Sequence, residues 1–225
     1  MKLLISGTDT GIGKTVATCA LLRSLAARSI AALGMKPISA GVNSQGLWDD
    51  VEQIRSASPI SAPVEDVAPY RLRAAASPHF AAAEDGITIR SDVVLAALER
   101  LEQQAEVVLI EGVGGFRVPL SRELDSADLA QAIGAPVLLV VPMRLGCINH
   151  ALLSAEAIAR RGLALAGWLA NRGIDPDYAR AADTIDTISD RIGTSCLGVL
   201  PKLDRETGSA GGIAVDALLA RLRKQ

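Results

Sequence analysis

Short apolar runs alternate with longer helix-like segments along most of this chain, and this alternation constrains its fold more than any other feature. The strand-like runs are Lys2–Ser6, Ala31–Lys36, Val107–Glu111, Pro136–Pro142, Ala166–Asn171 and Cys196–Leu200. Four of them are nearly unbroken apolar runs, as expected of strands covered on both faces. The alternation predicts βαβ units, and therefore an α/β fold with a doubly wound, mostly parallel sheet and helices on both faces.

The helices are predicted from apolar spacing and capping residues. Ser91 is a candidate N-cap, because Val94, Leu98 and Leu101 follow it at helical spacing. The other helices are expected at about Lys14–Arg28, Ser126–Ile133, Asn149–Arg161 and Gly212–Arg223. The stretch Ser56–Asp85 carries four prolines and little periodicity, which predicts an irregular excursion or a short helix between loops. No repeat or linker divides the 225 residues, so we expect one domain over residues 1–225.

Charge and composition exclude several classes of function. A formal net charge of −2 gives no field that would attract nucleic acid or an anionic membrane surface. No apolar run approaches the ~20 residues that span a bilayer, and no secretory signal is visible. The three cysteines, Cys19, Cys147 and Cys196, are widely separated and lack Cys-x-x-Cys spacing, which disfavours a zinc site. These features predict a cytoplasmic protein that binds neither nucleic acid nor membrane.

The loop after the first strand is the strongest functional signal. Residues 7–15 read GTDTGIGKT, which departs from the strict Gly-x4-Gly-Lys-Ser/Thr pattern because Thr8 occupies the first glycine position. Gly11 and Gly13 still let backbone N–H groups turn toward an anion, and the following helix adds its positive dipole end. Lys14 can then reach the outer phosphates, and the Thr15 hydroxyl can ligate Mg²⁺. The loop therefore predicts a site for a nucleoside triphosphate with Mg²⁺.

Magnesium needs further oxygen ligands, and the sequence offers two sources of carboxylates. Glu111 ends an apolar strand, so in a parallel sheet it points to the same edge as the phosphate loop. Asp49 and Asp50 form a second acidic pair, and either could instead cap a helix.

Several dispersed segments, together with the phosphate loop, resemble the dethiobiotin synthetase family. They are GMKPISAG at 34–41, SPH at 77–79, EGVGG at 111–115, Pro119-Leu120, LGCINH at 145–150 and GWLAN at 167–171. Their order and number make the resemblance specific, and it extends to about Leu203.

The resemblance implies a reaction in which 7,8-diaminopelargonic acid, CO₂ (or bicarbonate as its source) and ATP give dethiobiotin, ADP and phosphate. One amine captures CO₂ as a carbamate, and a carbamate oxygen then attacks the γ-phosphorus of ATP. The second amine closes the ureido ring on the resulting carbamic–phosphoric anhydride and expels phosphate.

Residue roles follow from the same resemblance. Lys14 and Lys36 match catalytic lysines, although Lys36 taken alone would be an ordinary exposed lysine at a strand end. The metal ligands are Thr15, Asp50 and Glu111. The substrate-binding residues are Thr10, Lys36, Ala40 and Asn149. The nucleotide-binding residues are Gly11, Ile12, Gly13, Lys14, Thr15, Val16, Asp50, Glu111, Gly112, Val113, Gly114, Asn171, Arg172, Leu200, Pro201 and Lys202.

The resemblance also implies a homodimer, since Asn149 matches a residue that reaches the substrate of the neighbouring subunit. Asn149 could equally be a simple N-cap of its helix. Ala40 replaces a Ser or Thr of many relatives, and Asp49 could exchange roles with Asp50. His79 is expected to be a structural, hydrogen-bonded histidine. The stretch Arg205–Gly212 looks unlike the family.

The main alternative is a partitioning or cell-division-positioning ATPase, which would act through partner proteins. Such proteins carry a signature lysine at the position that Asp9 occupies here, so the sequence disfavours this class. Cobyrinic- or cobyric-acid amide synthases usually need an added glutaminase domain, for which 225 residues leave no room. A nucleoside kinase would leave Lys36-Pro37 and the EGVGG segment unexplained.

Overall fold

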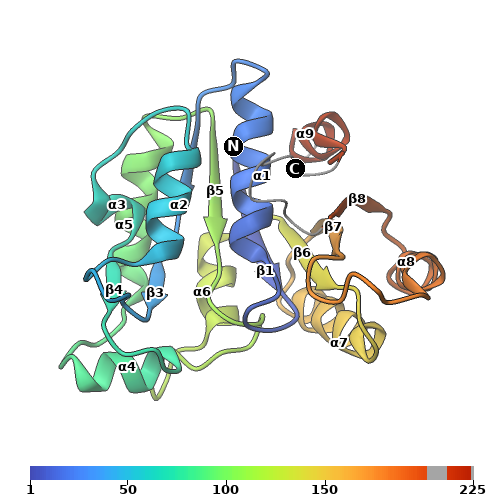
Figure 1. Cartoon of the computed structure of the whole chain (residues 1–225). Coiled ribbons are helices and arrows are strands. Elements are labelled where there is room, and N and C mark those ends of the chain that lie inside the picture. Colours follow the sequence, from blue (N-terminus) through green and yellow to red (C-terminus); the bar gives the residue numbers. More distant parts are fainter. Residues whose placement is uncertain (202–211, 224–225) are drawn as a thin grey trace.

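A six-stranded sheet forms the centre of the computed structural model, which describes residues 1–201 and 212–223 (Figure 1). The strands are β1 (Lys2–Gly7), β2 (Ala32–Met35), β5 (Val107–Glu111), β6 (Val137–Pro142), β7 (Leu165–Asn171) and β8 (Cys196–Leu200). They lie in the order β2-β5-β1-β6-β7-β8, and every neighbouring pair is parallel. The predicted α/β class with a parallel sheet is confirmed.

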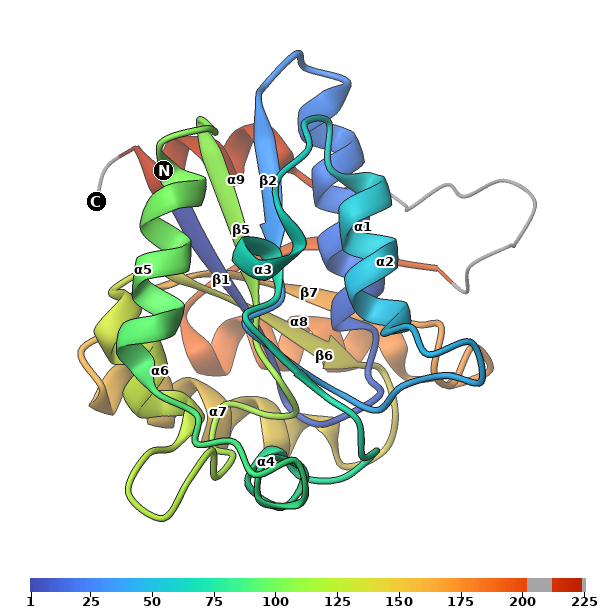
Figure 2. The ribbon, with the colours of Figure 1, turned by 90° about the vertical axis from the view of Figure 1, so that its left-hand side faces the viewer.

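Helices cover both faces of the sheet, as Figure 2 shows with α1 and α2 on one side and α5 and α6 on the other. The helices of the first face are α1 (Lys14–Ala26), α2 (Asp49–Ala57) and α9 (Val215–Leu222), and those of the second are α5 (Ser91–Glu102), α6 (Ser126–Ile133), α7 (Cys147–Arg160) and α8 (Ala181–Ile192). Along β1, Leu3 and Ile5 pack with the first group, whereas Leu4 packs with the second. Because successive side chains of a strand point to opposite faces, β1 contributes residues to two separate hydrophobic cores, one on each face of the sheet.

All six predicted strands are confirmed, with boundaries that differ by one residue at most. The helix Ser126–Ile133 is also placed as predicted, and Asp125 with Asp128 forms a capping box at its start. The N-cap prediction at Ser91 is wrong. The helix α5 begins at Ser91 itself, Arg90 precedes it as the cap residue, and no side chain caps the first turn.

The stretch Ser56–Asp85 contains more regular structure than the sequence predicts. It forms α3 (Val64–Val67), β4 (Tyr70–Leu72) and α4 (Pro78–Glu84), and β4 pairs in parallel with β3 (Ile38–Ala40) in a second, two-stranded sheet. The Trp48 indole N–H donates to the Leu72 carbonyl oxygen at 2.8 Å, which fixes this small sheet against the start of α2. The β3 strand follows Lys36-Pro37 directly. The two-stranded sheet of β3 and β4 therefore sets the direction of the chain beside Lys36.

The strand order changes direction at β1, and the carboxyl ends of β1, β2 and β5 meet at one edge of the sheet. In sheets of this kind ligands bind at such an edge. The phosphate loop follows β1, Lys36 follows β2, and Glu111 ends β5. Among the described residues, no helix is long and apolar enough to cross a membrane.

Close packing between β2 and its covering helices predicts a strong effect of one added methyl group. A Cβ at Gly34 would lie 2.3 Å from Ile54 Cγ2 and 3.0 Å from Leu22 Cδ1, and both side chains are fully buried. We expect Gly34→Ala to lower the free energy of unfolding by about 1–3 kcal/mol, as overpacked core sites do. Urea denaturation followed by circular dichroism would measure it.

Gly212→Ala is the control, because a Cβ there meets nothing within 4 Å. It should change the free energy of unfolding by less than about 0.5 kcal/mol. Equal stability of the two variants would contradict the described packing of α1 and α2 on β2.

Candidate active site at the carboxyl edge of the sheet

A side chain at the end of β7 holds the phosphate loop in place. The Asn171 amide donates to the Ile12 carbonyl oxygen at 2.8 Å, and its oxygen accepts from the Gly173 N–H at 2.8 Å. A Cβ at Gly13 would lie 2.2 Å from the Asn171 amide nitrogen, and Gly13 has a φ of 90°. Glycine is therefore required at residue 13 both for its backbone conformation and for this close approach.

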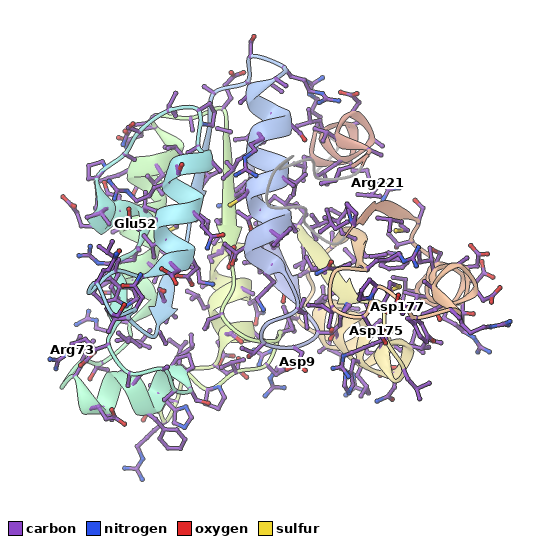
Figure 3. The ribbon with its side chains drawn as sticks, in the orientation of Figure 1. Asp9, Glu52, Arg73, Asp175, Asp177 and Arg221 are labelled. Atoms are coloured by element: carbon purple, nitrogen blue, oxygen red, sulfur yellow. The ribbon has the colours of Figure 1, made fainter. Side chains whose placement is uncertain are left out.

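Lys14 lies inside the loop rather than on the surface, with 6% of its area exposed. Its ammonium donates to the Asp9 carbonyl oxygen at 2.8 Å, and Asp9 lies at the tip of the loop between β1 and α1 (Figure 3). Burial and then the positive charge of Lys36 lower the pKa of Lys14 to about 8, against the opposing charges of Glu111 and Asp9. Negative charge supplied to this loop would restore the protonated form.

Glu111 accepts hydrogen bonds from three side chains of the site. It is only 1% exposed. One carboxylate oxygen accepts from the Thr15 hydroxyl at 2.9 Å and from the Lys36 ammonium at 2.6 Å. The other accepts from the Thr18 hydroxyl at 2.8 Å. Three donors from two elements thus converge on one buried acid, which satisfies the hydrogen bonds that a buried carboxylate requires.

Lys36 is buried between two acids. Its ammonium lies 2.6 Å from Glu111 Oε1 and 3.1 Å from Asp50 Oδ2. Burial alone would lower the pKa of Lys36, but the charges of Glu111 and Asp50 and their hydrogen bonds outweigh it, so the net shift is upward. The Ser39 hydroxyl donates to the other Asp50 oxygen at 2.6 Å, which orients this carboxylate toward the site.

The two adjacent aspartates of α2 face different ways. Asp50 joins Lys36, whereas Asp49 is exposed and accepts from the Asn43 side-chain amide at 2.6 Å. Successive residues of a helix point about 100° apart, so only one of the pair can face the sheet edge. The geometry favours Asp50 over Asp49 at the site.

The donor set at this edge suits a magnesium ion held together with a nucleotide. Two carboxylates and one hydroxyl, from Asp50, Glu111 and Thr15, gather around a single buried cation, the Lys36 ammonium. Within residues 1–201 and 212–223, no group of three or more His, Cys, Asp or Glu side chains could hold a metal by itself. Magnesium commonly takes one or two carboxylates and completes its shell with phosphates and water, so the residues present could hold it.

A cavity of about 400 Å³ opens at this edge and collects most of the predicted site residues. Its lining comprises Thr10, Gly11, Gly13, Lys14, Thr15, Val16, Lys36, Ala40, Asp50, Gln53, Glu111, Val113 and Gly114. A neighbouring hollow is lined by Gly11, Gly13, Val16, Asn171, Gly173, Ile174 and Pro201. The two hollows share Gly11, Gly13 and Val16, so they form one continuous surface around the phosphate loop.

The remaining predicted residues lie elsewhere. Ile12 is buried under the loop, and Leu200 is a core residue whose carbonyl oxygen accepts from the Arg172 N–H at 2.8 Å. Gly112 borders a different cavity, deeper in the molecule. Asn149 is exposed on the first turn of α7 and lines neither hollow. Lys202 and most of the stretch Arg205–Gly212 lie outside the described residues.

Three polar residues at the site were not predicted from the sequence: Thr18, Ser39 and Gln53. Each follows a predicted site residue by three positions, after Thr15, Lys36 and Asp50. For Thr18 and Gln53 this spacing returns to the same face of a helix, which is the signal that would have found them.

The prediction of a hydrogen-bonded His79 is wrong for its Nδ1 atom. This atom is buried, and no hydrogen-bond partner for it exists within the described part of the chain. The ring lies against Phe80, with 3.9 Å between ring centroids.

Comparison with known proteins relates most of the chain to one family. The family described as "AAA domain" matches residues 1–209. The ATP-dependent dethiobiotin synthetase BioD of Aromatoleum aromaticum is 50% identical over 200 residues, which cover 88% of each chain. The protein of the same name from Ralstonia nicotianae is 45% identical over 222 residues, which cover 96% of each.

Solved structures with much lower identity share the fold alone. The MinD cell division protein of Aquifex aeolicus is 14% identical, with a TM-score of 0.61 over 100% of this chain and 97% of that one. A ParA family ATPase from Chlorobium tepidum is 11% identical, with a TM-score of 0.56 over 98% and 90% of the two chains.

The lowered pKa of Lys14 predicts a specific pH dependence of nucleotide binding. In the free protein the amine is mostly charged below pH 8 and neutral above it, whereas bound phosphates favour the charged form. Above about pH 8, binding must therefore take up a proton, and affinity should fall by up to tenfold per pH unit. Calorimetric titration with ADP from pH 7 to 9.5, in buffers of different ionisation enthalpy, measures both quantities.

Lys14→Arg provides the control, because its guanidinium stays charged over this range. Its affinity should vary less with pH than that of the wild type, whatever its absolute value. A wild-type affinity that stays constant from pH 7 to 9.5 without proton uptake would contradict the lowered pKa.

Proposed function

Because this chain belongs to the ATP-dependent dethiobiotin synthetase family, we propose that it converts 7,8-diaminopelargonic acid, CO₂ and ATP into dethiobiotin, ADP and phosphate, in biotin biosynthesis. The observation that carries the proposal is the buried Lys36 ammonium beside the phosphate loop. A second fixed cation next to the loop lysine suits an anionic acceptor of the phosphoryl group, such as a carbamate. We place the reaction in a single domain and in the cytoplasm.

The proposed sequence of bonds is as follows. An amine nitrogen of the diamine bonds to the carbon of CO₂ and loses a proton, which gives a carbamate. A carbamate oxygen attacks the γ-phosphorus of ATP, and ADP leaves with the electrons of the broken P–O bond. The second amine attacks the carbonyl carbon of this anhydride and loses a proton, phosphate leaves with the electrons of the broken C–O bond, and the ureido ring is closed.

Phosphoryl transfer depends on positioning and charge neutralisation more than on covalent help from the protein. In this proposal Lys14 neutralises the β- and γ-phosphates, and Lys36 neutralises the carbamate and the transferring oxygens. The loss of one donor placed in this way costs about 3–4 kcal/mol of transition-state stabilisation. Thr10 and Ala40, which line the same cavity, would contact the diamine or its carbamate.

Thr15, Asp50 and Glu111 would hold magnesium, which supplies Lewis-acid polarisation of the phosphate oxygens. Lys36 forms ion pairs with Glu111 and Asp50, so in this proposal the catalytic cation and the metal would share the same two acids. Hydrogen bonds from Ser39 and Thr18 keep both acids oriented.

The nucleotide would lie along the continuous surface around the phosphate loop. Asn171 and Pro201 border its outer hollow, which suits a base, with Gly11, Gly13 and Val16 between base and phosphates. Arg172, which follows β7, and Leu200, which ends β8, would frame the base. Lys202 is proposed as a further nucleotide-binding residue. Val113 and Gly114, which line the cavity at the phosphate loop, would face the phosphates.

The face of α7 supports a homodimer. Leu145, just before the helix, is 83% exposed, and Leu153 is 56% exposed. Asn149 lies one helical turn before Leu153 and is also exposed. Apolar side chains flanking a polar one on an otherwise open helix face are typical of a subunit contact. In the dimer, Asn149 would reach the substrate bound by the other subunit.

The decisive experiment is mass-spectrometric detection of product. Purified protein receives MgATP, bicarbonate with carbonic anhydrase, and 7,8-diaminopelargonic acid, and ADP is followed in parallel. Dethiobiotin should appear in a one-to-one ratio with ADP. ADP release that is indifferent to the diamine, without a ureido product, would overturn the proposal and favour a partner-driven ATPase.

Lys36→Ala should separate chemistry from nucleotide binding. We expect turnover to fall about 10²–10³-fold, the cost of losing one preorganised donor, while the Kd for ADP changes less than about threefold. Lys2→Ala is the matched control, because Lys2 starts β1 at the opposite edge of the sheet and pairs only at 3.8 Å with Glu102. An equal loss of binding and turnover would assign Lys36 to binding or folding instead.

Thr15→Val should weaken the metal dependence of nucleotide binding. Valine keeps the shape of threonine but removes the hydroxyl that could ligate magnesium. Calorimetric titration of ATP at a series of Mg²⁺ concentrations should give a right-shifted metal dependence, with unchanged affinity for metal-free ADP. Metal titrations identical to those of the wild type would remove Thr15 from the ligand set.

A further inference from the structure

A second, smaller cavity lies directly behind the active site, between β1, β5 and α6. It has a free volume of about 30 Å³, two to three times the ~10–15 Å³ that holds one water molecule. Apolar side chains from five parts of the fold form its walls, chiefly Leu4, Ile38, Ile110, Phe116, Leu129 and Ile133. Every one of these side chains is itself at least 94% buried.

The few polar groups at this cavity offer little to a charged guest. The Ser126 hydroxyl is already used, since it donates to the Phe116 carbonyl oxygen at 2.7 Å and accepts from the Val118 N–H at 2.8 Å. Both Glu111 oxygens are engaged by Thr15, Thr18 and Lys36. An ion placed here would lose its hydration without gaining a partner, which is strongly unfavourable.

Ser6 supplies the remaining polar side chain at the cavity. It is 4% exposed and lies on the same face of β1 as Leu4. A hydroxyl of this kind could donate to a weak acceptor oxygen.

The cavity shares a wall with the active site. Glu111 and Val113 border both spaces. Gly112 lines the smaller one, and its carbonyl oxygen lies 3.5 Å from the Lys36 ammonium. A molecule held in this cavity is therefore separated from the carbamate-forming site only by the chain between β5 and its following loop.

We propose that this cavity binds CO₂ and supplies it to the amine of the diamine substrate. This inference rests on the proposed function and gives the CO₂ of that reaction a binding place in the fold. CO₂ is small, uncharged and without hydrogen-bond donors, so dry apolar walls accept it. Bicarbonate is charged and is excluded by the same walls. The amine nitrogen bonds to the CO₂ carbon, one C–O π bond becomes the carbamate anion, and the amine proton goes to solvent.

Crystals of the full chain pressurised with CO₂ test occupancy directly and need no turnover. Density for a linear molecule should appear between Ser6, Phe116 and Ile133 in wild-type crystals and be absent in crystals pressurised with nitrogen. A cavity that stays empty under CO₂, or that holds ordered water instead, would overturn the proposal.

Ala130→Val tests the functional consequence. Ala130 lines the cavity from α6, so the two added methyl carbons reduce its volume. We expect the KM for CO₂ to rise at least threefold while the KM for ATP stays within twofold. Ala132→Val is the control, because Ala132 is exposed on the same helix and has the same intrinsic cost of a β-branched residue. An unchanged KM for CO₂ in Ala130→Val would overturn the proposal.

The proposed function and the cavity proposal can be overturned independently of each other. Wild-type protein that makes no dethiobiotin would overturn the proposed function, whatever the crystals show. Wild-type protein that makes dethiobiotin, while its cavity stays empty in crystals pressurised with CO₂, would overturn the cavity proposal alone. Should Ala130→Val fail to fold, the pressurised wild-type crystals still decide the matter.

Discussion

The buried pair of Glu111 and Lys36 is the interaction on which the site depends. Each group is at most 5% exposed, and the two charged atoms lie 2.6 Å apart. Neither charge could be buried alone, since removing one partner of such a pair costs about 3–5 kcal/mol. Glu111 ends β5 and Lys36 follows β2, which are neighbours in the sheet. The pair therefore joins the strand that supplies an acid to the strand that supplies a cation.

The hydrogen bonds around this pair connect three further elements to it. Thr15 and Thr18 bring in α1, and Asp50 brings in α2 with support from Ser39. Low local dielectric strengthens these bonds and makes an unpaired member costly. The same network that stabilises the protein thus preorganises oxygen ligands and an ammonium beside the phosphate loop. In the proposed function, stability and readiness for phosphoryl transfer would have one physical origin.

Some of this arrangement could be predicted from the sequence, for identifiable reasons. Glu111 ends an unbroken apolar strand, so its place at the sheet edge follows from local pattern alone. Lys36 is different, because composition and spacing describe an exposed lysine. Its burial depends on acids 14 and 75 positions further along the chain, and only the family resemblance indicated a role for it. The parallel pairing of β3 with β4 was missed for a similar reason, since prolines mask a strand whose partner is distant.

The fold by itself does not select a function for this chain. A ParA family ATPase and a cell division protein, which are 11% and 14% identical to it, share its architecture over nearly its whole length. A glycine-rich loop before a helix suits a phosphate, but a shared fold does not identify a reaction. Next to the loop, this chain has a second buried cation, two oriented carboxylates, and behind them a small cavity with mostly apolar walls. The proposed acceptor is formed from an uncharged gas and then neutralised as an anion. It would use both kinds of surface, one apolar and one cationic.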